Sequence, residues 1–127
     1  MKLTKNFNLQ EFESKDGAKM TREVMEQVFL LSDNLQIIRD KIGTRLNMSN
    51  GYRSPAHNKA VGGVPDSQHL LGKAADLSSY DHTPKELYDI IEDLISFGEI
   101  SEGGLGLYKS FVHYDIRGHK ARWDKTQ

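Results

Sequence analysis

Apolar residues in the first third of the chain recur at the spacing of an α-helix. Between residues 21 and 42 they step by four and three, which places them on one face of a helix; they are Val24, Val28, Leu31, Leu35, Ile38 and Ile42. Thr21 is suited to cap the start of this helix and Gly43 its end. The run covers only about three heptads, so we predict a helix that packs on the core and not a dimerising coiled coil.

A second amphipathic segment begins with a strong start signal. Thr83 and Glu86 form a capping box, and Pro84 between them suits the first helical position. The apolar face that follows consists of Leu87, Ile90, Ile91, Leu94 and Ile95. We therefore predict a helix that runs through Phe97 and is ended by Gly98.

Shorter apolar runs, bounded by turn residues, predict strands. The last two of these strands are joined by a tight turn and are expected to be antiparallel. After the first strand, Pro55 predicts a short helix. Helices and strands do not alternate regularly, so the predicted class is α+β, with a small antiparallel sheet flanked by helices in a single domain of residues 1–127. The predicted strands are residues 45–50, 73–79, 104–108 and 111–116.

Composition and charge exclude several classes of protein. The net charge is −1 and the basic residues are scattered, so no basic field marks a nucleic-acid or anionic-membrane binder. Because there is no cysteine, any metal must be held by His, Asp or Glu. No segment could span a membrane and the N-terminus lacks a signal-peptide core. We expect a monomer, made in the cytoplasm, that reaches a target at the cell wall only after release or on a particle.

Two histidines and two aspartates carry the candidate chemistry. His69 ends a loop, and Gly72 lets the chain turn so that Asp76 falls on the following strand. His113 and Asp115 alternate along an apolar strand and therefore point to the same face. Two imidazoles and one carboxylate are a usual ligand set for catalytic zinc. We predict a zinc ion held by His69, Asp76 and His113, and hence a zinc-dependent hydrolase.

Other residues have more than one possible role. Asp115 could take a proton from the zinc-activated water as general base, or could orient an imidazole from behind; with the base as the working hypothesis, Asp115→Asn should keep the metal and lose turnover. Arg53 on a loop suits a substrate carboxylate. Ser67 could hydrogen-bond the substrate or a ligand. His119 is the rival to His113 as third ligand.

The segment Ser67-Gln-His-Leu-Leu-Gly-Lys-Ala-Ala-Asp76 resembles the Ser-x-His-x-x-Gly-x-Ala-x-Asp signature of the zinc D-Ala-D-Ala carboxypeptidase family. That family includes vancomycin-resistance dipeptidases and phage endolysins, and hedgehog signalling domains have a related fold. Residues 49–58, 61–66 and 111–123 resemble the compact phage and prophage branch. The resemblance runs from Lys5 to Trp123, nearly the whole chain.

The resemblance implies a hedgehog- and DD-peptidase-like α+β fold. It also implies a zinc peptidase that cleaves amide bonds involving D-amino acids in peptidoglycan stem peptides, as a D,D-carboxypeptidase or endopeptidase of cell-wall lysis or remodelling. Carried over by motif, His69, Asp76 and His113 match the zinc ligands. Arg53 matches the substrate-binding arginine, and Ser67 matches the serine that opens the signature.

One departure from the family pattern keeps other hypotheses open. Many members carry an Asp or Glu three residues before the last ligand, where this chain has Ser110. Asp115 is then the candidate base, and a non-catalytic zinc-containing cell-wall binding or phage-particle module is the alternative. A cytoplasmic dipeptidase acting on free D-Ala-D-Ala is a third hypothesis.

Overall fold

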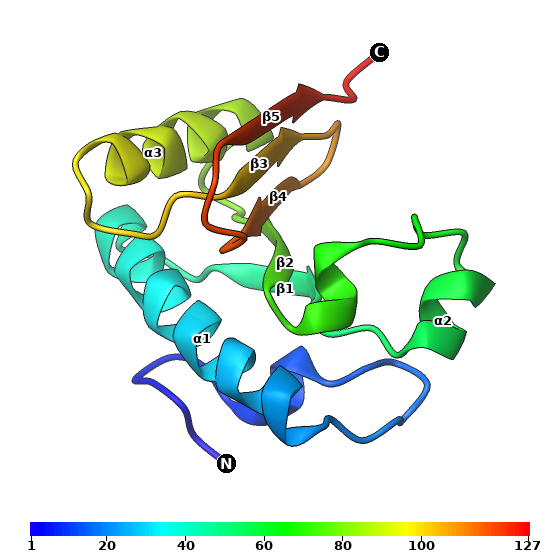
Figure 1. Ribbon diagram of the computed structural model, residues 1–127. Helices are drawn as coiled ribbons and strands as arrows, with labels where there is room; N and C mark the ends of the chain where they lie inside the picture. The colour runs from blue at the N-terminus through cyan, green and yellow to red at the C-terminus, as the bar shows by residue number, and fades with distance from the viewer.

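A five-stranded sheet, with two helices packed against one of its faces, forms the centre of the structure (Figure 1). The structure, a computed structural model, describes residues 1–127. Two short 3-10 helices are labelled η. In chain order the elements are η1 (Leu9–Phe12), α1 (Arg22–Ile42), β1 (Asn47–Asn50), α2 (Pro55–Ala60), η2 (Gln68–Leu71), β2 (Ala74–Ser78), α3 (Pro84–Ser96), β3 (Gly104–Leu107), β4 (Val112–Asp115) and β5 (Ala121–Asp124).

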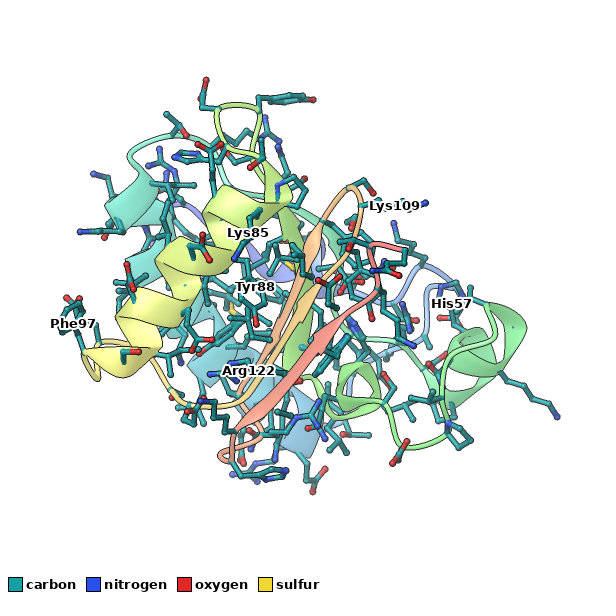
Figure 2. All side chains as sticks on the ribbon, turned by 90° about the horizontal axis from the view of Figure 1, so that it is seen from above. His57, Lys85, Tyr88, Phe97, Lys109 and Arg122 are labelled. Atoms are coloured by element: carbon teal, nitrogen blue, oxygen red, sulfur yellow. The ribbon has the colours of Figure 1, made fainter.

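The sheet has the strand order β1-β2-β4-β3-β5 and is mixed. Its first four strands pair antiparallel, whereas β5 pairs parallel with β3. The α+β class is confirmed. The prediction of an antiparallel sheet is wrong for its last strand, because β5, which was not predicted, pairs parallel with β3. Arg122 of β5 lies beside α3, where it donates to both carboxylate oxygens of Glu92 at 2.8 Å (Figure 2). Backbone pairing with β3 and this contact across 30 residues hold the strand in place, and neither follows from a local pattern.

Both long helices form where the hydrophobic pattern predicts them. The Thr21 hydroxyl accepts from the Val24 amide at 3.2 Å at the start of α1, and Gly43 ends it in the left-handed conformation. Both hydrogen bonds of the capping box at Thr83 are present at the start of α3. None of the helices is both long and apolar enough to cross a membrane.

Strand alternation divides the residues of the central strands β2 and β4 between two environments. One face of the sheet packs on α1 and α3 and is apolar. Its buried members on these two strands are Ala75, Leu77, Val112 and Tyr114. The intervening residues, which include Asp76, His113 and Asp115, point to the opposite face. The polar site therefore lies on the side of the sheet that the two long helices leave uncovered.

The N-terminal segment supports the loop that follows β1. Phe7 and Phe12 are buried in the core, and the Tyr52 amide donates to the Phe12 carbonyl at 2.8 Å. A Cβ at Gly51 would come within 2.8 Å of the Phe12 backbone, so only glycine allows this close approach. The loop that carries Arg53 is thus held between the N-terminal segment and the sheet.

Asp16 adds a second attachment for the same loop. Its carboxylate accepts hydrogen bonds from the Ser14 hydroxyl at 2.6 Å and the Ser54 hydroxyl at 2.5 Å, and from the amide of Ala18. These bonds, with Ser14 the largest contributor, lower the pKa of Asp16 from 3.8 to about 2. A carboxyl group with a lowered folded-state pKa stabilises the fold above its unfolded pKa, and this stabilisation is lost as the pH falls.

Asp16→Asn should therefore make the stability of the protein less sensitive to acid between about pH 4 and pH 2. In the wild type the free energy of unfolding should fall through this window as Asp16 is protonated, and the variant should lack that part of the decline. Urea unfolding at several pH values measures it. Asp33→Asn, at an exposed carboxylate of α1, is the control and should keep the wild-type slope.

Candidate metal centre

Three buried side chains from three elements meet on the uncovered face of the sheet. His69 comes from η2, Asp76 from β2 and His113 from β4, and the last two are paired across neighbouring strands. One donor atom from each lies within 4.8 Å of the others. Their exposed fractions are 4%, 4% and 8%, so this group of polar side chains is sheltered from solvent and needs partners.

The distances among these donor atoms fit a tetrahedral metal ion. His69 Nε2 lies 3.4 Å from Asp76 Oδ1, and His113 Nδ1 lies 3.4 Å from the same oxygen. Two ligand atoms at about 2.0–2.1 Å from a tetrahedral zinc ion are about 3.4 Å apart. With no cysteine in the chain, two imidazoles and one carboxylate form a donor set that suits zinc and leaves one position open.

Hydrogen bonds determine which nitrogen of His69 is free. Its Nδ1 lies 2.7 Å from the Gly51 carbonyl, which can only accept, so Nδ1 carries the proton and Nε2 presents its lone pair to the site. The Arg53 amide donates to the His69 carbonyl at 3.0 Å, which fastens the same loop to η2 at a second point. The ring orientation therefore depends on the loop after β1.

In His113 the other ring nitrogen carries the proton, because Asp115 accepts a hydrogen bond from it. Its Nε2 lies 2.6 Å from Asp115 Oδ2, so Nε2 donates and Nδ1 faces the other two ligands. The Asp115 side chain is fully buried and also accepts from the Gly104 amide and from Arg117, whose Nε and Nη2 donate at 2.9 and 2.7 Å. Both carboxylate oxygens of Asp115 are thus engaged behind the ring and away from the three donor atoms.

The ionisation of these groups follows from their contacts. Burial opposes ionisation of Asp76, but hydrogen bonds with His113 and His69 outweigh it and hold the pKa of Asp76 below its ordinary value. Burial likewise opposes ionisation of Asp115, and Arg117 and His113 lower its pKa. Burial lowers the pKa of His113, but hydrogen bonds with the two carboxylates raise it overall. Protons and a metal ion therefore compete for its Nδ1.

A cleft of about 580 Å³ opens over the three donor residues. The loop of residues 61–68 and Arg53 line one side. On the other, Tyr108 and Phe111 stack with ring centroids 4.3 Å apart, and Trp123 lies 5.0 Å from the His113 ring. The indole of Trp123 occupies space that a Cβ at residue 106, a glycine, would fill. The cleft thus combines an aromatic wall with three cationic side chains, which are Arg53, Arg117 and Lys125.

The other candidate residues from the sequence do not belong to the ligand cluster, and only some of them lie near it. Arg53 and Ser67 both line the cleft, and the Ser67 hydroxyl also accepts from the His69 amide at 3.2 Å as a local cap. His119 is exposed on the turn before β5 and takes no part in the cluster. His57 lies on α2, well to the side of the sheet (Figure 2). The structure therefore brings His69 and His113 together, as predicted, and leaves His119 and His57 outside the cluster.

Several contacts that support the site were missed by the sequence analysis. Asn50 donates to Asp76 Oδ2 at 3.1 Å, Arg117 holds Asp115, and Asn58 accepts from Arg53 at 3.4 Å. Asn50 and Asn58 carried no signal beyond their place in the segment that resembles the family. Arg117 follows Asp115 by two residues, a spacing that could have indicated an ion pair.

Comparison with known proteins agrees with this geometry. A family model described as peptidase M15 matches residues 3–115, which is most of the chain. No curated protein matches it. The match includes all three donor residues, whereas Arg117 and the aromatic side chain of β5 lie beyond it. The chain therefore belongs to the peptidase M15 family of zinc D-Ala-D-Ala carboxypeptidases, and is a zinc metallopeptidase of the kind that acts on peptidoglycan.

Proposed function

We propose that this protein hydrolyses amide bonds involving D-amino acids in peptidoglycan stem peptides, as a D,D-carboxypeptidase or endopeptidase of cell-wall lysis or remodelling. The observation that carries the proposal is the buried triad of His69, Asp76 and His113, whose free nitrogens and carboxylate oxygen meet beneath an open cleft. The active unit is a monomer of one domain that reaches the wall after release from the cell or on a particle.

The three donor residues would hold the zinc ion, and hydrogen bonds from neighbouring groups orient the two histidine rings. A bound zinc ion would supply Lewis acidity for polarising the scissile carbonyl and activating water. The Gly51 carbonyl holds His69 in the tautomer that ligation needs, and Asp115 does the same for His113. These two hydrogen bonds would keep both rings in the orientation that metal binding needs.

Arg53 is proposed to bind a carboxylate of the stem peptide. Its side chain lines the cleft, and Nη2 lies 4.0 Å from Asp76 Oδ2, next to the ligand cluster. Its Nε is buried without a hydrogen-bond partner. A guanidinium with unused donors beside the metal site suits bidentate recognition of a carboxylate, which would align the scissile bond.

We assign Asp115 to orienting His113 rather than to proton transfer. A general base has to reach the cleft with a free oxygen, whereas both oxygens of Asp115 are engaged by His113, Arg117 and a backbone amide. The only other carboxylate that lines the cleft, besides the ligand Asp76, is Asp66 on the loop after α2. Asp66 is therefore the side chain to test for proton transfer.

Incubation of the zinc-loaded protein with purified sacculi tests the proposal. Mass spectrometry of the soluble products should show new peptide termini: free D-alanine for a carboxypeptidase, separated cross-linked peptides for an endopeptidase. His113→Ala, which lacks one proposed ligand, should release neither product. A wild-type protein that carries zinc but releases nothing would contradict the enzymatic function.

That last outcome would favour a non-catalytic cell-wall binding or phage-particle module. The observation in favour of this second candidate is the residue three positions before His113, which is Ser110, an exposed side chain on the hairpin turn. Such a module should sediment with sacculi in the presence of zinc without cleaving them.

A further inference from the structure

We propose that Asn58 is a positioning residue that holds the Arg53 guanidinium and the loop of residues 61–66 in one arrangement, and so shapes the site for the substrate carboxylate. The inference rests on the role proposed above for Arg53. It concerns a side chain that does not line the cleft and makes no hydrogen bond to the proposed metal ligands. Asn58 would act on the substrate only through its neighbours.

The burial of Asn58 is unusual for its helix. It is the only buried residue of α2, with an exposed fraction of 4%, and it is polar. An apolar side chain would be the ordinary occupant of the one inward position on a short amphipathic helix. A buried amide is costly unless its groups are paired, so its partners indicate what it is there to hold.

Those partners are Arg53 and the loop that follows α2. The Asn58 Oδ1 accepts from Arg53 Nη1 at 3.4 Å, and its Nδ2 donates to the Val64 carbonyl at 2.9 Å. The backbone carbonyl of Asn58 also accepts from the Gly63 amide at 2.9 Å. One residue therefore connects the guanidinium to two points of the loop that lines the same side of the cleft.

Gly63 shows how closely these groups fit. A Cβ at this position would lie 2.1 Å from Asn58 Oδ1 and 3.1 Å from Arg53 Nη1. Gly63 does not have a positive φ, so the backbone would accept alanine there. Glycine is required by the neighbouring amide, in contrast to Gly62, which has a φ of 73° and open space around it.

Arg53 has few other constraints on its side chain. Its guanidinium donates a single hydrogen bond, which goes to Asn58. Its Nε has no partner, and Asp76 lies 4.0 Å from Nη2. Loss of the Asn58 amide should therefore let the guanidinium move, while the metal ligands keep their own hydrogen bonds. The effect should appear in recognition of a carboxylate and not in metal binding.

The test measures binding of two probes to the zinc-loaded protein by NMR titration. N-acetyl-D-alanine carries a carboxylate, and N-acetyl-D-alaninamide is its uncharged control. Asn58→Ala should weaken binding of the acid by about tenfold, the size expected for one hydrogen bond to a charged group, and should leave the amide unaffected. Gly63→Ala should act in the same direction because its methyl group displaces the Asn58 amide. Lys59→Ala, the exposed neighbour on α2, should bind both probes as the wild type does.

A double variant separates action through Arg53 from a general structural effect. If Asn58 acts through Arg53, Arg53→Ala combined with Asn58→Ala should bind the acid no more weakly than Arg53→Ala alone. Additive losses, or wild-type affinity in Asn58→Ala, would overturn the inference. Zinc content should stay at about one ion per chain in every variant, and its loss in Asn58→Ala would also contradict it.

Two further readouts separate this inference from the function on which it rests. Equal binding of acid and amide by the wild type would contradict the role of Arg53 and, with it, this inference. Absence of turnover on sacculi with normal discrimination between the probes would contradict only the enzymatic function. Amide hydrogen exchange of residues 61–66 should be faster in Asn58→Ala than in Lys59→Ala, and equal rates would show that Asn58 does not hold the loop.

Discussion

Alanine at His113 or at His69 should remove the metal from the purified protein and abolish hydrolysis. Each change deletes one of the three donor atoms that lie within 4.8 Å of one another. Loss of a partner behind a ligand weakens metal affinity by about 10–100-fold, so loss of the ligand itself should cost more than about 100-fold. Elemental analysis after exchange into buffer with trace zinc should show about one ion per chain in the wild type and nearly none in either variant.

His119→Ala is the matched control for this experiment. His119 is the rival ligand, but it is exposed and lies outside the cluster, so its variant should keep both zinc and activity. Circular dichroism should establish that all three variants are folded. Zinc that persists in His113→Ala and disappears in His119→Ala would overturn the proposed ligand set.

Asp115→Asn should destabilise the protein and weaken its zinc affinity at the same time. The amide of asparagine would place two N–H donors among groups that already donate, namely the His113 ring, Arg117 and the Gly104 amide. Breaking a buried ion pair by removing one partner costs about 3–5 kcal/mol of stability. The loss of the acceptor behind His113 should lower zinc affinity by about 10–100-fold.

Two measurements check this expectation. Urea unfolding gives the change in stability, and competition with a chromophoric chelator gives the zinc affinity. Asp66→Asn changes the exposed carboxylate of the cleft and should leave both quantities at wild-type values. If Asp115→Asn instead binds zinc normally and loses only turnover, then Asp115 is the general base, as the sequence analysis first assumed.

The two long helices could be predicted from the sequence because their signals are local. The stripe from Val24 to Ile42 and the capping box at Thr83 each depend on residues within a few positions of one another. The pairing of β5 with β3 could not be predicted in this way. It depends on Arg122 reaching Glu92 of α3, 30 residues earlier, and on space beside Gly106 for an indole ring.

The candidate ligands could likewise be predicted from local signals, whereas the residues that hold them in place could not. The motif Ser-x-His-x-x-Gly-x-Ala-x-Asp and the His-x-Asp strand indicated the three donor residues, because strand alternation and the family signature are properties of short segments. The hydrogen bonds of Asn50 and Asn58 carried no comparable signal. The bond from Asn50 to Asp76 spans 26 residues, and the bonds of Asn58 depend on how α2 lies against the loops before and after it.

By itself, then, the sequence determined the α+β class, the two long helices, the family and the candidate donor residues. Only the tertiary structure decided that His69 presents Nε2 and His113 Nδ1, since the choice depends on the Gly51 carbonyl and on Asp115. It also placed both oxygens of Asp115 behind the ring. The reason is that the residue type alone shows which side chains can bind a metal. The tautomer of a histidine and the function of a carboxylate depend on hydrogen-bond partners that folding brings within 3 Å.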